Sequence, residues 1–233
     1  MSTQKHILVT GANGQLGMEF RALEKSYPGY HFLFATREEL PVNDEDAINA
    51  FFVKNVISHC INCAAYTAVD KAETEPEEAF KINAEAVKKL AEACQSHEAL
   101  FIHISTDYVF NGEGSSPYSE TDPTSPVSVY GSSKLKGEAL AREYCEETII
   151  IRTSWVYSRY GKNFVKTMMR LMAEKDSIGV VSDQFGAPTY AADLAEAILQ
   201  IINRFEKPAS GIYHYSNLGL ISWFDFARAI KEI

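Results

Sequence analysis

The sequence has little that would place the protein in a membrane, on nucleic acid or in an oxidising compartment. No apolar run approaches the roughly 20 residues that a helix needs to cross a bilayer, and the opening Met-Ser-Thr-Gln-Lys lacks the apolar core of a signal peptide. Positive charge is also scarce, because the formal net charge is −9. A charge of that sign disfavours nucleic acid and anionic lipid as partners. We therefore expect a cytoplasmic protein with neither a nucleic-acid nor a membrane partner.

Cysteine is scarce as well. The four cysteines are scattered, and two of them, Cys60 and Cys63, fall within one strand-like run. Residues three apart on a strand point to opposite faces, so this pair is poorly placed to share a metal. We expect reduced thiols in the core and predict no metal-binding residues.

What the chain does have is enough apolar sequence for a large core, with 46% hydrophobic residues in 233. Short apolar runs alternate with helical patterns, which is typical of βαβ units and a doubly wound parallel sheet. The clearest helix runs from Pro76 to Ser96, with Asn83 inside its apolar stripe. We interpret Asn83 as a buried amide with its hydrogen bonds satisfied, or else as a cap for a strand end. The predicted strands are 6–10, 31–35, 59–64, 100–105 and 148–152.

A glycine-rich turn follows the first predicted strand, and a helical pattern begins directly after it at Gln15. A strand, a glycine turn and a helix place a pyrophosphate at a helix N-terminus. Gly11 permits the tight turn, Gly14 lets the backbone approach phosphate, and Gly17 lets the helix pack on the sheet. The spacing is G-x-x-G-x-x-G, one residue wider than the common dinucleotide fingerprint. The pattern predicts a dinucleotide site.

A second pattern predicts acid–base chemistry. Tyr130 and Lys134 are four residues apart, so on a helix they share a face. A lysine ammonium favours the phenolate, and we expect it to lower the tyrosine pKa from its ordinary value of about 10. The hydroxyl of Thr106, at the end of a buried strand, would complete a pocket for a carbonyl oxygen. These three side chains suit proton transfer to or from a carbinol oxygen.

The end of the second predicted strand indicates which dinucleotide is used. NAD enzymes usually carry an acidic residue there, which binds the ribose 2′-hydroxyl. Here Thr36 and Arg37 follow the strand, with Glu38 and Glu39 next to them. A hydroxyl and a guanidinium suit a 2′-phosphate. We predict NADP(H) as the preferred cofactor, with NAD(H) also used; the alternative is that Arg37 is an ordinary exposed arginine.

Several long blocks of sequence together resemble one family. The chain is similar to the dTDP-4-dehydrorhamnose reductases, which are extended short-chain dehydrogenase/reductases that make dTDP-L-rhamnose. The resemblance covers nearly the whole sequence and is carried by residues 10–17, 62–73, 105–110, 129–134, 152–157, 163–168 and 183–189. The Gly-Gly-x-Gly-Phe-Ile-Gly style loop of nucleotide-sugar epimerases and dehydratases is absent.

The resemblance implies a role for each matching residue. Tyr130 would donate the proton, and Lys134 would contact the nicotinamide ribose. Thr106, Asp107 and Trp155 would contact the sugar of a dTDP-sugar substrate. The remaining implied contacts are to the dinucleotide: Gly14, Gln15 and Leu16 along the pyrophosphate, and Ala64, Ala65 and Tyr66 along the ribose and the adenine-side linkage.

The family also implies an architecture. We expect a Rossmann-like dinucleotide-binding domain over residues 1–155, and a substrate-side lobe over 156–233, interleaved with a returning strand and helix. Relatives continue for some 50 residues or more, so we expect an incomplete C-terminus whose final helix has little to pack against. Some relatives dimerise with magnesium at the interface, so the resemblance alone allows a homodimer and magnesium, but no local group of carboxylates in the sequence requires the metal. The alternative function is a non-catalytic, NADP-binding regulatory subunit resembling that of methionine adenosyltransferase.

Overall fold

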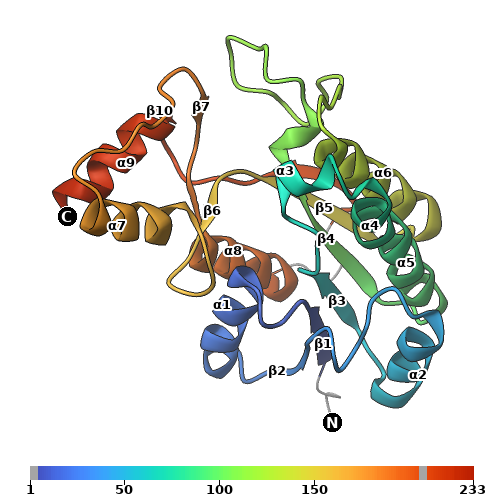
Figure 1. Ribbon diagram of the computed structural model, residues 1–233. Coiled ribbons are helices and arrows are strands. Elements are labelled where there is room, and N and C mark those ends of the chain that lie inside the picture. Colours follow the sequence, from blue (N-terminus) through green and yellow to red (C-terminus); the bar gives the residue numbers. More distant parts are fainter. Residues whose placement is uncertain (1–4, 205–208) are drawn as a thin grey trace.

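A six-stranded parallel sheet forms the centre of the molecule, with the strand order β2-β1-β3-β4-β5-β9 (Figure 1). The computed structural model describes residues 5–204 and 209–233. The five strands predicted from the sequence are confirmed within one or two residues at each end. The strands of the sheet are β1 (Lys5–Thr10), β2 (Tyr30–Ala35), β3 (His59–Asn62), β4 (Leu100–Thr106), β5 (Thr148–Thr153) and β9 (Gly211–His214).

The strand order reverses between β1 and β3, which are neighbours on the sheet although β2 lies between them in the chain. In doubly wound sheets, ligands bind outside the carboxyl ends of the strands at such a switch point. Thr10 and Asn62 end the two strands and are register partners. The predicted glycine turn therefore begins at the place where this topology puts a ligand.

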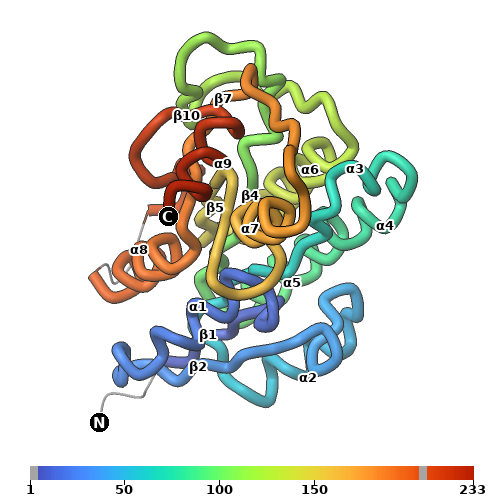
Figure 2. Tube along the Cα trace, turned by 60° about the vertical axis from the view of Figure 1, so that its left-hand side comes forward, coloured from blue at the N-terminus to red at the C-terminus, as the bar shows by residue number. Residues whose placement is uncertain are grey.

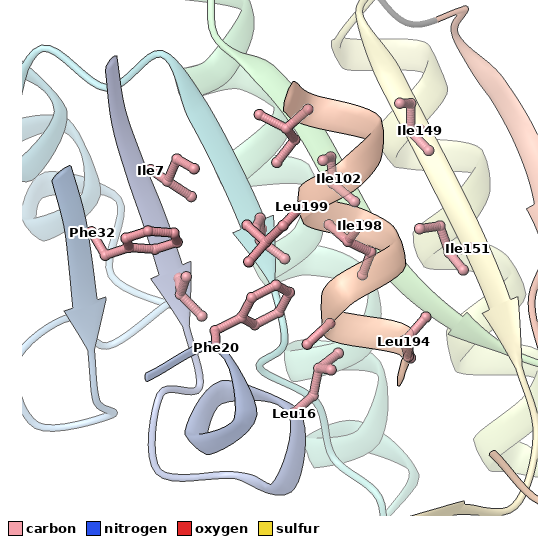
Figure 3. Close-up of a cluster of buried hydrophobic side chains, with 14 of the residues drawn as sticks. Ile7, Leu16, Phe20, Phe32, Ile102, Ile149, Ile151, Leu194, Ile198 and Leu199 are labelled. Carbon is pink, nitrogen blue, oxygen red and sulfur yellow. The ribbon is translucent and has the colours of Figure 1, made fainter. Parts of the chain in front are cut away.

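Helices cover both faces of the sheet. On one face lie α1 (Gln15–Leu23) and α8 (Ala191–Arg204), and Figure 3 shows Phe20 and Leu16 meeting Leu194 and Ile198 over the sheet. The opposite face carries α2 (Glu45–Asn55), α5 (Ala86–Ser96) and α6 (Val129–Tyr144). Cys60 is buried on this second face while Cys63 packs on the first, and both thiols are free, as predicted.

The long helix predicted over Pro76–Ser96 is present but is interrupted. It consists of α4 (Pro76–Phe80), a π-helical segment (Lys81–Glu85) and α5, and it follows the short α3 (Val69–Ala72). Asn83 lies in the π-helical segment and is fully buried. Short 3₁₀ turns follow α1 (Glu24–Ser26) and β4 (Asp107–Val109).

The segments after β5 form a smaller lobe beside the sheet, where α7, α9 and the C-terminus lie together in both views (Figures 1 and 2). Its helices are α7 (Phe164–Glu174) and α9 (Trp223–Glu232), and its short strand pairs are β6 (Val156–Tyr157) with β8 (Thr189–Tyr190) and β7 (Phe185–Gly186) with β10 (Ile221–Ser222). In contrast, α8 and β9 return to the main sheet. The domain boundary at residue 155 stays a prediction.

The expectation that the last helix has little to pack against holds in part, because Ala227 is the single buried residue of α9 but one aromatic face of the helix meets α7. Phe226 on α9 stacks on Phe164 of α7, with ring centroids 5.5 Å apart, and also meets the Tyr157 ring edge-on. Ser222 and Asp225 form a capping box that starts the helix. An aromatic face therefore packs α9 against α7, and the reciprocal cap fixes where α9 begins.

Candidate active site

The turn between β1 and α1 is shaped to receive an anion. Gly11 has a φ of +61°, and a Cβ there would lie 2.7 Å from the Ala64 nitrogen. A Cβ on Gly17 would lie 2.6 Å from the Cα of Ala12, so only glycine lets the helix start this close to the turn. Gly14 caps α1 without any side-chain hydrogen bond. The first backbone N–H groups of the helix are thus left for a phosphate, and this geometry fits the pyrophosphate of a dinucleotide.

The loop after β3 is held against this turn by two amide side chains. The Ala64 N–H donates to Asn62 Oδ1 at 3.2 Å. Asn83 accepts the Tyr66 N–H at 2.9 Å and donates to the Tyr66 carbonyl at 3.0 Å. The interpretation of Asn83 as a satisfied buried amide is confirmed, and the same bonds fix the loop 64–66, including Ala65, beside the glycine turn.

The end of β2 carries a carboxylate at its tip, which the sequence argument did not place there. Glu39 folds back so that its Oε2 accepts the Thr36 N–H at 2.9 Å. Hydrogen bonds with the backbone and the side chain of Thr36 lower the pKa of the Glu39 carboxyl. Arg37 is largely exposed, with Nη2 3.9 Å from Glu78 Oε1. The guanidinium is therefore loosely held and free to turn toward a phosphate.

Tyr130 lies in the first turn of α6, and three contacts fix the start of this helix. Ser128 caps it by accepting the Gly131 N–H at 3.0 Å. The carboxylate of Glu73 accepts the Val129 N–H at 2.8 Å. A Cβ on Gly131 would lie 2.2 Å from the Tyr108 carbonyl oxygen, so glycine lets α6 press on the turn after β4. The predicted helical placement of Tyr130 and Lys134 is confirmed.

The turn after β4 brings Thr106 and Asp107 next to Tyr130. The Thr106 hydroxyl donates to Asp107 Oδ1 at 3.0 Å and accepts the Tyr108 N–H at 3.2 Å. The ring of Tyr108 meets the Tyr130 ring edge-on at 5.6 Å. Burial raises the pKa of Asp107 to about 6, although the hydrogen bonds with Thr106 and the backbone act in the opposite sense.

The expectation that Lys134 lowers the pKa of Tyr130 is wrong. Burial raises the pKa of the Tyr130 phenol to about 12; the Thr106 hydroxyl lowers it, and Asp107 and Tyr108 raise it further. The phenol is therefore fully protonated at neutral pH, which suits a group that gives up a proton.

Lys134 is 2% exposed and is bound by the sheet. Its Nζ donates to the Ile104 carbonyl at 2.7 Å and lies 3.3 Å from His103 Nε2. Burial lowers the lysine pKa to about 8, against the opposing effects of Glu138 and Cys63. In this position Nζ faces β4, and this is why it does not act on the Tyr130 phenol.

Sequence reasoning missed the polar groups that hold Lys134 and Arg152. His103 lies in the run Leu-Phe-Ile-His-Ile, where a lone polar residue in a buried strand was the available signal. Glu138 binds Arg152 through two hydrogen bonds, of 2.9 and 2.7 Å, and accepts a third from Ser105. The side chains of four of these residues are buried: His103, Ser105, Glu138 and Arg152.

Trp155 lies directly after β5, at the start of the smaller lobe. Its φ is +47°, and its ring stacks on Trp223 at 3.6 Å between centroids. A Cβ on Gly186 would lie 2.7 Å from Trp155 Cε2, so glycine is required beneath the ring. The structure thus makes Trp155 part of the junction between the lobe and the sheet.

Within residues 5–204 and 209–233, no three His, Cys, Asp or Glu side chains gather in a way that could hold a metal ion. None of the helices described is both long enough and apolar enough to cross a bilayer.

Comparison with known proteins agrees with the fold. The family model of the RmlD substrate binding domain matches residues 5–233. The dTDP-4-dehydrorhamnose reductase of Aggregatibacter actinomycetemcomitans is 44% identical, over 97% of this chain and 78% of the relative. The spore coat polysaccharide biosynthesis protein SpsK of Bacillus subtilis shows the same identity and coverage.

A solved structure is similarly close. The dTDP-4-dehydrorhamnose reductase of Bacillus anthracis, in complex with NADP, superposes with a TM-score of 0.94 at 40% identity. The match covers 99% of this chain and 80% of that one.

Proposed function

Since the chain belongs to the RmlD family of dTDP-4-dehydrorhamnose reductases, we propose that it reduces the C4 ketone of dTDP-4-dehydro-β-L-rhamnose to give dTDP-β-L-rhamnose. The observation that carries the proposal is the meeting of Tyr130, Thr106 and Asp107 where β4 ends and α6 begins. That meeting point lies at the same edge of the sheet as the glycine turn. A dinucleotide on the turn and a sugar beside Tyr130 would therefore be neighbours.

Tyr130, Thr106 and Asp107 would each have a separate role in the reaction. A bound nicotinamide supplies the hydride to C4. Tyr130 donates its phenolic proton to the oxygen that becomes the hydroxyl, and its raised pKa keeps that proton in place until the oxygen takes it. The Thr106 hydroxyl, now directed at Asp107, would turn to the same oxygen and orient it. Asp107 would then hold a sugar hydroxyl.

The backbone at the start of α1 would bind the pyrophosphate, through the N–H groups near Gly14, Gln15 and Leu16. Lys134 would leave its bond with Ile104 to contact the nicotinamide ribose. NADP(H) is the favoured cofactor, supported by the NADP complex of the Bacillus anthracis relative and by the loosely held Arg37 at the end of β2. Magnesium, a homodimer and a cytoplasmic location stay predictions.

The alternative, a non-catalytic regulatory subunit, requires no intact proton donor. Two of the three relatives reported above carry the name of a reductase, and the three catalytic candidates are present here, which favours the enzyme.

An assay with the keto sugar separates the two functions. We expect absorbance at 340 nm to fall when NADPH, the chain and dTDP-4-dehydro-β-L-rhamnose are mixed, with one dTDP-rhamnose formed per NADPH. Tyr130→Phe should abolish the change, while Tyr144→Phe, at the far end of the same helix, should leave it intact. NADPH binding without consumption would refute the reductase and favour the regulatory subunit.

A further inference from the structure

Buried polar side chains cross the sheet from the glycine turn to Lys134. Thr10, Asn62 and His103 are register partners on β1, β3 and β4, and each is at most 2% exposed. Thr10 Oγ1 lies 2.7 Å from Asn62 Oδ1, Asn62 Nδ2 lies 3.1 Å from His103 Nδ1, and His103 Nε2 lies 3.3 Å from Lys134 Nζ. One residue per strand thus connects the dinucleotide turn to the lysine.

The orientation of the Asn62 amide decides which way these hydrogen bonds run. The backbone N–H of Ala64 can only donate, and it lies 3.2 Å from the amide atom that faces the turn. The 2.7 Å contact with Thr10 also has the length of an O–H···O bond. The oxygen of Asn62 therefore faces Thr10, and its nitrogen donates to His103 Nδ1.

The Asn62 amide thereby selects the tautomer of the neutral His103 ring, that is, which ring nitrogen carries the proton. A nitrogen that accepts a hydrogen bond carries no proton, so the neutral ring holds its proton on Nε2. Burial lowers the pKa of His103 well below its ordinary range, and Lys134 adds to the effect, so the ring is neutral. His103 therefore presents an N–H donor to Lys134.

A donor at this position favours one form of the lysine. An ammonium group has three donors and no acceptor, whereas the free amine has a lone pair. Nζ already donates to the Ile104 carbonyl, so a lone pair is free to accept from Nε2. We propose that His103 is a positioning residue that stabilises the uncharged amine of Lys134 relative to the ammonium, by donating its Nε2–H to Nζ. The proposal relies on the proposed function only for the contact of Lys134 with the ribose.

The charged and titratable groups around Nζ are compatible with this. Glu138 on α6 favours the ammonium, but two hydrogen bonds from Arg152 balance its charge. Cys63 also acts in that sense, yet burial raises the pKa of its thiol so that it is uncharged at neutral pH. Burial likewise keeps the Tyr130 phenol protonated. The desolvation of Nζ is therefore the largest effect, and it lowers the pKa of Lys134 to about 8.

The consequence is a link between dinucleotide binding and a proton. When Lys134 turns from His103 to a ribose hydroxyl, the amine can take a proton from a buffer acid: an N–H bond forms at Nζ, and the buffer acid loses its proton. From an initial pKa of about 8 and a final one near the ordinary lysine value, linkage gives uptake of about 0.1 proton at pH 7 and about 0.9 at pH 9.

The first test measures Lys134 in the ligand-free chain. With lysine labelled by ¹³C and ¹⁵N, and the Lys134 signal assigned by its loss in Lys134→Arg, we expect a titration near pH 8. His103→Phe keeps a ring on Phe101 but removes the donor, and should raise the pKa by about one pH unit. His103→Gln retains an amide N–H near Nε2 and should titrate as the wild type does. His59→Phe, at another buried histidine on β3, is the matched control and should have no effect.

The second test is calorimetry of NADPH binding at pH 7 and pH 9, in buffers that differ in ionisation enthalpy. We expect proton uptake at pH 9 that is several-fold larger than at pH 7, and a smaller difference in His103→Phe. A wild-type Lys134 that titrates near its ordinary value, or that is unmoved or lowered in His103→Phe, would overturn the proposal. Neither test uses the sugar, so a chain that fails to reduce it refutes the proposed function and leaves this inference standing.

Discussion

At the scale of single residues, the phenol of Tyr130 carries the most specific prediction. Tyr130→Phe removes one hydroxyl and keeps the ring against Tyr108. We expect turnover to fall by at least about 10²-fold, the usual scale for a general acid, with NADPH affinity unchanged. Steady-state kinetics and calorimetry provide the two readouts. Near-normal turnover in the variant would remove Tyr130 from the mechanism.

Asp107 provides a test of stability against pH. Its folded pKa, about 6, is raised above the unfolded value of 3.8. The protonated carboxyl therefore favours the fold below about pH 4, and this contribution is lost as the pH rises through 6. Asp107→Asn should stabilise the chain by about 3 kcal/mol at pH 7 and by little at pH 4, while weakening sugar binding.

Denaturant unfolding at the two pH values checks this prediction. Asp176→Asn, at an exposed position in the loop after α7, is the control and should change neither curve. An equal gain for Asp107→Asn at both pH values would show that the carboxyl is not held in its protonated form.

Arg37 determines cofactor choice in this account. An arginine–phosphate bond is charge-assisted, but Arg37 is exposed, and Glu38 and Glu39 follow it, so we expect only a several-fold preference for NADPH over NADH. Arg37→Asp should reverse the ratio of kcat/KM values by removing the phosphate partner and offering the 2′-hydroxyl an acceptor. A wild type that prefers NADH, or a ratio unmoved by the substitution, would place the 2′-phosphate elsewhere.

The sequence predicted the candidate reacting groups but not what surrounds them. Tyr130 and Lys134 are found because a four-residue spacing becomes a shared face as soon as a helix forms. His103 is found only in the fold, since it meets Lys134 across 31 residues of chain. The expectation for the Tyr130 pKa was wrong for a similar reason. Burial raises that pKa, and burial depends on the tertiary fold, which residue spacing in the sequence does not reveal.

At the scale of elements, the position of α6 against the π-helical segment is the feature to test. A Cβ on Gly137 would lie 2.0 Å from the Asn83 carbonyl oxygen, so α6 packs at backbone contact one turn beyond Lys134. Gly137→Ala must push the two elements apart, and we expect a loss of about 1–3 kcal/mol in unfolding free energy. Turnover should fall as well, because Tyr130 moves with its helix.

Gly29→Ala is the matched control, since a Cβ there meets nothing within 4 Å. It should leave stability and turnover close to the wild type. If Gly137→Ala behaves in the same way, the close contact with Asn83 does not position α6.

The helix over Pro76–Ser96 shows which features a periodic sequence pattern predicts and which it does not. Its ends were predicted because its apolar residues recur at helical spacing and proline marks its start. The π-helical turn at Lys81–Glu85 was not predicted, because it coincides with contacts that Asn83 makes to Tyr66 and Ser133. Tyr66 and Ser133 come from other parts of the chain, so the local spacing of apolar residues cannot predict these contacts.

At the scale of the whole molecule, the two ligands draw on different parts of the fold. The predicted dinucleotide contacts all lie at the carboxyl edge of the main sheet, whereas Trp155 joins the smaller lobe through Trp223. We expect this chain to bind NADP(H) more tightly than the dTDP-sugar. Trp223→Ala should weaken the sugar and leave the dinucleotide unchanged, as calorimetry can show. Equal weakening of both ligands would contradict this division.

The whole-molecule architecture followed from the alternation of strands and helices, since parallel strands need helical crossovers. The packing of the last helix did not follow, because Phe226, Phe164 and Tyr157 come from three separate segments. Their contact depends on how the lobe folds back on itself, and the sequence pattern of each segment alone says nothing about it.

The central claim, direct reduction of a sugar ketone at C4 with Tyr130 as the acid, is tested most directly by isotope transfer. NADPH carrying deuterium at the transferable position of its nicotinamide should deliver that deuterium to C4 of the product rhamnose, where NMR locates it. Tyr130→Phe should bind the labelled cofactor and transfer at least about 10²-fold more slowly. Product without deuterium at C4 from either labelled face of the nicotinamide, or transfer at an undiminished rate by Tyr130→Phe, would contradict the account.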